Sequence, residues 1–235
     1  MPVLSVPRVR LVVPAYFHPA LRPGDWEWLA SRPDLVRCVV LNIDSGPGTA
    51  RRAEFAAAAG RLAAAGVSVL GYADTAYGHR DPRLVAADIR RYLDWYPVIG
   101  VCLDRAAAGP ACLGRYALLS GQARAMFAGD GTVFFNHGTY PAEGYAAHAD
   151  LLGVFEGPWR AYRRLRPAAW TRRHPADAFY HVVHSVPPGE AAAAWRLAAR
   201  RRAGAAYVTD RSGPNPYDAL PAWLPGGPGA LEDPA

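Results

Sequence analysis

Eight short apolar runs recur along the chain, separated by longer segments of mixed character. They are Val9–Pro14, Val36–Ile43, Val67–Ala73, Val98–Leu103, Thr132–Phe135, Leu151–Phe155, Phe179–Val183 and Ala205–Thr209. A strand that is buried on both faces reads as a nearly continuous apolar run, and parallel strands need a crossover of about a dozen residues or more. The pattern therefore predicts an α/β fold, a single (β/α)8 or TIM barrel with eight parallel strands.

The connecting segments have the features of helices. We expect helices at Asp25–Ala30, Glu54–Ala65, Pro82–Tyr96, Ala111–Phe127, Trp159–Leu165 and Glu190–Ala203. Asp81 and Pro82 are typical of an N-cap and a first helical position, and Gly66 and Gly204 are expected C-caps. No change in composition marks a domain boundary. We assign residues 1–224 to one barrel domain and the Pro- and Gly-rich residues 225–235 to an irregular tail.

Composition and charge narrow the class of partners. The 235 residues are 51% hydrophobic and 20% charged, which is ordinary for a globular protein. The net charge of +6 comes from arginine alone, and its clusters lack interleaved aromatics, so we expect solvated helix faces and no nucleic acid partner. No apolar stretch reaches the length of about 18 residues that a membrane span needs. The first residues lack the apolar core of a secretory signal, which favours a cytoplasmic location unless a leader has been removed.

Cysteines and histidines give no pattern of a disulfide framework or a metal site. Cys38 and Cys102 lie inside predicted strands, Cys112 makes the count odd, and no CxxC occurs. His181 and His184 stand three apart on a predicted strand and point to opposite faces. We expect no metal and no other cofactor.

Polar residues close most of the apolar runs, at the ends of barrel strands where catalytic groups lie. Asp44, Asp74 and Asp104 are each 30 residues apart, the length of one strand–helix unit, so they are expected at equivalent heights. Glu156 follows an apolar strand and is a poor helix cap. By alternation, Glu156 should share a face of its strand with Val154.

Seven motifs together carry a resemblance to a known family. They are Leu41-Asn42-Ile43-Asp44-Ser45-Gly46-Pro47-Gly48, Gly71-Tyr72-Ala73-Asp74-Thr75-Ala76-Tyr77-Gly78, Phe135-Asn136-His137-Gly138-Thr139, Val154-Phe155-Glu156-Gly157, His184-Ser185-Val186-Pro187, Tyr207-Val208-Thr209-Asp210 and Asn215-Pro216-Tyr217-Asp218-Ala219-Leu220-Pro221. The first resembles the N-x-x-S-G-P-G signature of the spherulin-4 (spherulation-specific family 4) proteins. The others follow in the family's order from about Val12 to Trp223.

The resemblance implies a glycoside hydrolase on a (β/α)8 barrel, acting on α-1,4-linked N-acetylgalactosamine polymers. In such relatives an Asp-Glu pair ends the fourth strand and a further Glu ends the sixth. Asp104 matches the Asp, and Glu156 matches the sixth-strand Glu. The second member of the pair is Arg105 in this chain.

Three interpretations of Arg105 are open. If the replaced acid is essential, the chain is a non-catalytic glycan-binding barrel. If Asp104 and Glu156 are the catalytic pair, the guanidinium would lower the pKa of Asp104 by about one to three units and keep it ionised. Glu156, desolvated by Phe155 and Trp159, would then be the general acid. In the third, Arg105 binds an anionic sugar or a phosphate. We favour the second interpretation.

A carbohydrate cleft is expected around the pair. Ends of the fourth and sixth strands lie about 10 Å apart, so inward-leaning carboxylates reach the separations of about 5–9.5 Å that glycosidases use. The residues expected to bind substrate are Tyr16, His18, Asn42, Asp74, Tyr77, Arg105, Asn136, Trp159 and His184. The sequence leaves open the glycan itself, the stereochemical outcome and the oligomeric state.

Overall fold

The eight apolar runs form a closed barrel of parallel strands in chain order, in a computed structural model that describes residues 9–224. The strands are β1 (Arg10–Ala15), β2 (Val36–Leu41), β3 (Ser68–Asp74), β4 (Gly100–Asp104), β5 (Thr132–Asn136), β6 (Leu151–Pro158), β7 (Phe179–His184) and β8 (Ala205–Val208). Their ends agree with the predicted runs to within two residues, except that β6 continues to Pro158. The predicted fold is confirmed. Residues 1–8 of the expected domain, and the expected tail 225–235, lie outside the described residues.

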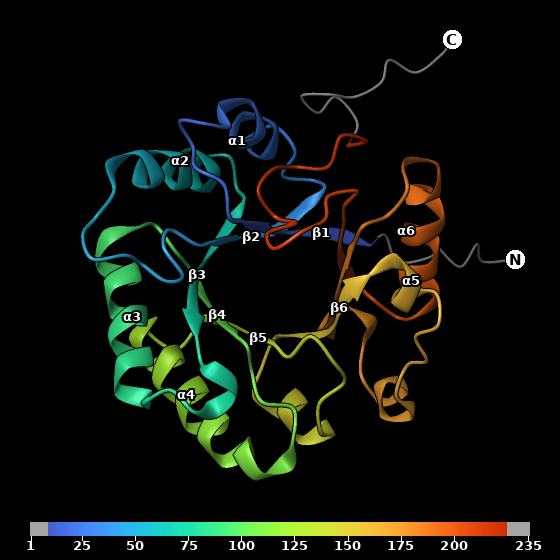
Figure 1. Ribbon diagram of the computed structural model, residues 1–235. Helices are drawn as coiled ribbons and strands as arrows, with labels where there is room; N and C mark the ends of the chain where they lie inside the picture. Colours follow the sequence, from blue (N-terminus) through green and yellow to red (C-terminus); the bar gives the residue numbers. More distant parts are fainter. Residues whose placement is uncertain (1–8, 225–235) are drawn as a thin grey trace, which may run out of the picture.

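Helices surround the ring of strands (Figure 1). They are α1 (Pro23–Ala30), α2 (Ala53–Ala64), α3 (Pro82–Trp95), α4 (Leu113–Met126), α5 (Trp159–Tyr162) and α6 (Ala191–Arg200). Short 3-10 turns are η1 (Ala76–Gly78), η2 (Pro110–Cys112), η3 (Glu143–Ala147), η4 (Ala169–Arg173), η5 (Ala176–Ala178) and η6 (Pro188–Glu190). Within residues 9–224, no helix combines the length and the apolar character that crossing a membrane requires.

Two of the three predicted helix caps agree with the structure. The Asp81 side chain accepts a hydrogen bond from the Arg83 amide (2.8 Å) and starts α3, while Gly66 has φ +81° after α2, as expected of a C-cap. The expectation for Gly204 is wrong. Arg202 takes the left-handed conformation (φ 63°) after α6. A Cβ on Gly204 would lie 2.4 Å from Asp177 Oδ1, so this glycine is required by close packing.

Side chains of alternate strand residues form two layers. Those that point outward pack against the helices, for example Leu103 and Phe135 against Ile89 and Tyr116. Those that point inward fill the barrel and end beneath its carboxyl rim: Val40, Cys102, Phe134, Tyr180 and Val182. The three cysteines are free thiols.

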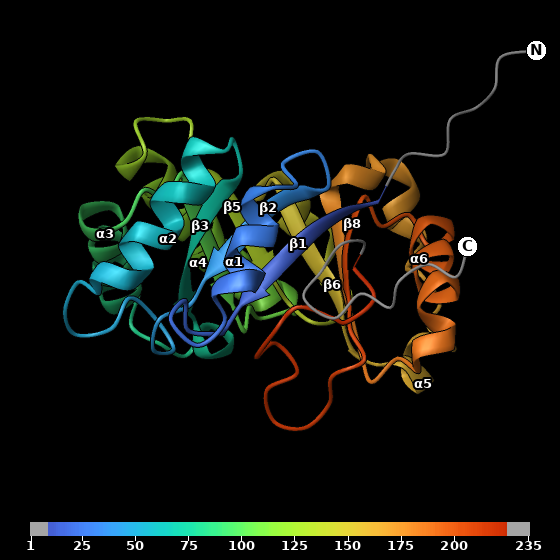
Figure 2. The ribbon, with the colours of Figure 1, turned by 90° about the horizontal axis from the view of Figure 1, so that it is seen from above.

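Residues that lie 30 positions apart in the sequence are paired across the neighbouring strands β2, β3 and β4. Leu41 pairs with Gly71, Gly71 with Val101, and Asp74 with Asp104. Since β2 ends at Leu41, Asp44 lies in the following loop and not on the sheet. The segment after β8 forms a long loop at one end of the barrel (red in Figure 2). Its Leu220 amide donates to the buried Asp25 carboxylate (3.0 Å), which fixes the loop to α1.

Gly71 provides a test of how closely the helices pack on the sheet. A Cβ at Gly71 would lie 2.5 Å from Cγ of Tyr92, whose hydroxyl donates to the Leu41 carbonyl (2.7 Å). We predict that Gly71→Ala destabilises the fold by about 1–3 kcal/mol because Tyr92 must move. The matched control is Gly60→Ala on α2, where a Cβ meets no atom within 4 Å and alanine favours the helix. Thermal unfolding should show a lower Tm for the first variant and an unchanged or higher Tm for the second.

Candidate active site

One amide group joins two carboxylates at the carboxyl rim of the barrel. Asp104 ends β4, Asn136 ends β5, and Glu156 lies on β6. Asn136 Nδ2 donates to Asp104 Oδ1 (2.8 Å) and to Glu156 Oε2 (2.8 Å). The two bonded oxygens therefore lie at most twice that distance apart, at the short end of the separations that we expected for a catalytic pair.

Each carboxylate also accepts a hydrogen bond from a tyrosine. The Tyr72 hydroxyl donates to Asp104 Oδ2 (2.8 Å), and the Tyr217 hydroxyl donates to Glu156 Oε1 (2.6 Å). Burial is the first cause that raises the pKa of each phenol, and the neighbouring carboxylate is the second. Both tyrosines therefore keep their protons and act as donors.

Asp104 has a raised pKa, which contradicts our favoured interpretation of Arg105. Burial raises it most and the charge of Glu156 adds to it, while hydrogen bonds from Asn136, Tyr72 and the Arg105 backbone oppose the shift. The Arg105 guanidinium does not hold Asp104 ionised. Its Nη1 pairs with Asp74 Oδ2 instead (2.9 Å).

The surroundings of Glu156 also differ from our expectation. Its side chain is exposed at the rim, and its aromatic neighbours in sequence lie elsewhere. Phe155 packs on Tyr162 outside the barrel, with ring centroids 4.8 Å apart. Trp159 is 6% exposed and donates through Nε1 to Glu190 (2.8 Å), so its expected place in the cleft is wrong. Neither ring desolvates the carboxylate as we expected.

An irregularity in β6 turns Glu156 inward. The pairing of β6 with β7 shifts register between Gly153 and Phe155, and Val154 packs in the outer layer. Glu156 and Val154 do not share a face, because such a bulge breaks the alternation of side chains. Register shifts of this kind are common beside active sites, where they redirect a side chain.

Gly153 makes room for the central amide. A Cβ at this position would lie 2.1 Å from Asn136 Oδ1, on the partner strand. The oxygen of Asn136 is buried there and has no hydrogen-bond partner among the described residues. The amide thus directs both of its N–H groups toward the carboxylates.

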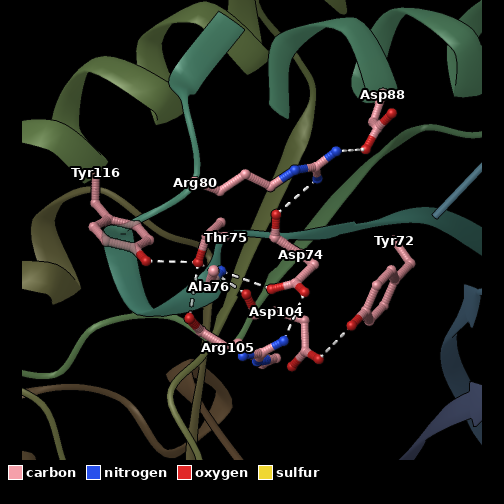
Figure 3. Close-up of polar contacts among 9 residues, drawn as sticks. All are labelled: Tyr72, Asp74, Thr75, Ala76, Arg80, Asp88, Asp104, Arg105 and Tyr116. Atoms are coloured by element: carbon pink, nitrogen blue, oxygen red, sulfur yellow. Dashed lines mark hydrogen bonds and ion pairs between the residues drawn. The ribbon is translucent and has the colours of Figure 1, made fainter. Parts of the chain in front are cut away.

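The Arg105 side chain is directed to Asp74 and not to the carboxylate of its neighbour Asp104 (Figure 3). Its guanidinium binds Asp74 and lies over the ring of Tyr77, 5.1 Å from the centroid. Asp74 also accepts the Ala76 amide (2.7 Å). The charge of Asp74 is the first cause that raises the pKa of Arg105. Three residues that we expected at the substrate cleft, Asp74, Tyr77 and Arg105, therefore form one unit.

Unusual backbone conformations gather at this rim. Ser45, Ala76, Tyr77, Arg105 and Ser185 have φ between 46° and 56°. They follow the carboxyl ends of β2, β3, β4 and β7. Non-glycine residues in this region cost free energy and cluster at functional sites. The loops around Asp104 and Glu156 are therefore held against their local preference.

Two pockets at the rim contain both carboxylates of the pair, and a third lies beside them. An inner pocket of about 20 Å³, lined by Tyr16, Asp104, Asn136, Glu156 and Tyr217 among others, has room for about one water. A pocket of about 330 Å³, here called the β4–β5 pocket, is lined by Tyr77, Asp104, Arg105, Asn136, His137, Gly138 and Glu156. A further one of about 360 Å³, the β2–β3 pocket, is lined by Tyr16, Asn42, Ile43, Ser45, Tyr72, Pro214, Asn215 and Tyr217. Together they form a cleft with the carboxylates inside it.

The remaining expected residues lie farther out. Asn42 lines the β2–β3 pocket and accepts the Gly46 amide (3.0 Å). His18 pairs with Glu54 (3.3 Å) in a separate pocket next to β2. His184 ends β7 and contacts the Ser185 hydroxyl (3.0 Å), and burial lowers its pKa.

Our list of candidates lacks two site residues, Tyr72 on β3 and Tyr217. Tyr217 comes from the loop after β8, 61 residues beyond Glu156. The motif Asn215-Pro216-Tyr217-Asp218 was the available signal, but nothing in its spacing connects it to the end of β6.

Known proteins resemble this chain in both sequence and fold. The family model of spherulation-specific family 4 matches residues 10–226. Spherulin-4 of Physarum polycephalum is 27% identical over 229 residues, which cover 92% of this chain and 68% of that protein. The crystal structure of Aspergillus clavatus Sph3 in complex with GalNAc superimposes with a TM-score of 0.81 at 25% identity, covering 92% of this chain and 94% of the other.

A more distant likeness concerns the fold alone. The deoxyribose phosphate aldolase of Aeropyrum pernix has a TM-score of 0.54 at 13% identity, over 87% of this chain and 86% of the aldolase. Because the family model spans nearly the whole barrel, the chain belongs to spherulation-specific family 4.

Proposed function

We propose that this protein is a glycoside hydrolase that cleaves α-linked glycans of the N-acetylgalactosamine type. The observation that carries the proposal is the Asp104–Asn136–Glu156 bridge, which holds two carboxylates at one open cleft. Acid and base carboxylates in this arrangement are the chemistry of glycosidases. Similarity to Sph3, whose structure contains GalNAc, supports the choice of sugar.

The cleft is suited to sugar rings. Tyr16 packs edge-on against Tyr72 and Tyr217, with ring centroids 5.7 and 5.5 Å apart. These rings and the amide of Asn42 lie in the β2–β3 pocket, next to the carboxylates. Sugars present apolar C–H faces and hydroxyl groups, so aromatic rings and amides are suitable partners.

The protonation of the pair suggests separate roles. Two close carboxylates do not both ionise freely, and burial favours the protonated form at Asp104. We assign Asp104 as the general acid, which donates its proton to the glycosidic oxygen as the C1–O bond breaks. Glu156 is the partner that attacks C1 or orients the substrate acetamide for that attack. Water then attacks C1 and gives one proton back to Asp104. Its OH stays on C1, and the bond that C1 formed with Glu156 or with the acetamide oxygen breaks. These roles are the reverse of those we expected from the sequence.

Glu156→Gln tests catalysis. We predict that wild type hydrolyses α-1,4-linked N-acetylgalactosamine oligomers and that this variant loses about 10²–10⁴-fold in kcat while it still binds them, because the amide is neutral but similar in shape. Glu27→Gln, an exposed change on α1, is the control and should leave turnover unchanged. If wild type binds the oligomers without cleaving them, the chain is a glycan-binding barrel instead.

Asp104→Asn tests the raised pKa through stability. A carboxyl whose pKa is higher in the folded state costs stability above its unfolded pKa, and the cost disappears as the pH falls below that value. The variant should therefore have a higher Tm than wild type near pH 7, and the difference should shrink toward pH 3.5. Thermal unfolding across this range is the measurement. A lower Tm for the variant near neutral pH would contradict the assignment of Asp104 as the proton-holding member.

The short separation of the carboxylates predicts the stereochemistry. Retaining enzymes hold the two groups about 5–5.5 Å apart, whereas inverting enzymes need about 6.5–9.5 Å to admit a water. We expect the first product observed by proton NMR to be the α anomer. A first product in the β configuration would rule out direct or acetamide-assisted attack at C1.

A further inference from the structure

Arg105 contributes a positive charge to a pocket that also contains two acids. Among the described residues that line the β4–β5 pocket, it is the one with a permanent positive charge, beside Asp104 and Glu156. Its side chain is 48% exposed. It does not stabilise the ionised form of Asp104, so its place in the cleft needs another explanation.

The guanidinium is held in position by contacts that do not involve the catalytic pair. Asp74 binds Nη1, and the Tyr77 ring lies under the group. The Arg105 carbonyl accepts hydrogen bonds from the Tyr77 amide (2.6 Å) and the Thr75 hydroxyl (2.9 Å). These contacts keep Arg105 at φ 50°. A group fixed in this way loses little conformational entropy when a ligand binds.

Hydrogen bonds from Arg80 connect Asp74 to α3 (Figure 3). Arg80 donates to the Asp74 carbonyl (2.9 Å) and to the Asp88 carboxylate (2.6 Å). Asp88 is 6% exposed, so this anchor is buried in the scaffold. The position of Asp74, and through it that of Arg105, is therefore determined by the barrel and not by the ligand.

Asp74 does not use all of the N–H donors of the Arg105 guanidinium. A guanidinium carries five N–H groups in a planar fork, and an ion pair through Nη1 leaves donors for a second anion. The fork matches a carboxylate in shape. A singly charged carboxylate also suits a pocket that contains Asp104 and Glu156 better than a doubly charged phosphate, because each added negative charge is repelled by the negative charge that the pair carries.

We propose that Arg105 is a specificity-determining residue that pairs with a carboxylate on the sugar unit in the β4–β5 pocket. The substrate is then an acidic amino-sugar glycan that contains uronic acid units. This inference rests on the carbohydrate function proposed above and names the chemical class of its substrate.

The test compares two trisaccharides that differ only at C6. One is α-1,4-linked N-acetylgalactosamine, and the other is α-1,4-linked N-acetylgalactosaminuronic acid, each with sulfur in place of the glycosidic oxygens so that the protein does not cleave it. Isothermal titration calorimetry at low ionic strength gives both Kd values for each protein. We expect wild type to bind the acidic trisaccharide at least about tenfold more tightly, as a charge-assisted hydrogen bond pair allows.

Variants assign the preference to Arg105. Arg105→Gln should weaken binding of the acidic trisaccharide by about 10–100-fold and change that of the neutral one by less than about twofold. Arg105→Lys should retain part of the preference, since lysine keeps the charge but not the fork. Arg61→Gln, on the exposed face of α2, is the matched control and should behave as wild type.

The outcomes separate the two proposals. Equal affinity for both trisaccharides in wild type, or an acidic preference that survives Arg105→Gln, overturns the role of Arg105 and leaves the carbohydrate function standing. Failure of wild type to bind either trisaccharide overturns the carbohydrate function itself. A thermal unfolding curve for Arg105→Gln that matches wild type shows that a loss of affinity comes from the pocket and not from the fold.

Discussion

The site depends on the amide of Asn136, which stands between two groups that repel each other. Asp104 and Glu156 come from β4 and β6, and β5 lies between these strands. An amide nitrogen has two hydrogens, and Asn136 gives one to each carboxylate. The spacing of the carboxylates therefore follows from the spacing of three adjacent strands and the width of one amide group.

Two carboxylates so close together repel each other, and the residues around them offset this repulsion. Burial and Glu156 both raise the pKa of Asp104, while the hydroxyls of Tyr72 and Tyr217 donate to the outer oxygens of the pair. Each carboxylate thus accepts one tyrosine and shares the amide. Such a pair holds one proton readily at intermediate pH, which is the condition that acid and base catalysis on a glycosidic bond requires.

The backbone at the rim also helps to place Asn136 and the two carboxylates. Gly153 lacks the Cβ that would displace Asn136, and the register shift beside it turns Glu156 into the cleft. Left-handed residues follow four of the strands, and the hydrogen bonds of Thr75 and Tyr77 hold Arg105 among them. These conformations cost stability locally, and the large outer layer of apolar contacts between sheet and helices offsets that cost.

The sequence by itself determined the barrel, the ends of its strands and the side-chain types at its rim. Apolar runs and acids repeating every 30 residues are local features, and the repeat is the sheet register itself, with Asp74 paired to Asp104. The tertiary structure decided which polar groups meet. The partner of Arg105 is Asp74 rather than its neighbour Asp104, because a left-handed backbone redirects the side chain. Alternation failed at Glu156 because a register shift depends on the neighbouring strand. Trp159 begins α5 and packs in the outer layer, where its Nε1 donates to Glu190. Tyr217 reaches Glu156 only because the loop after β8 folds back over the rim, a long-range contact that no local pattern encodes.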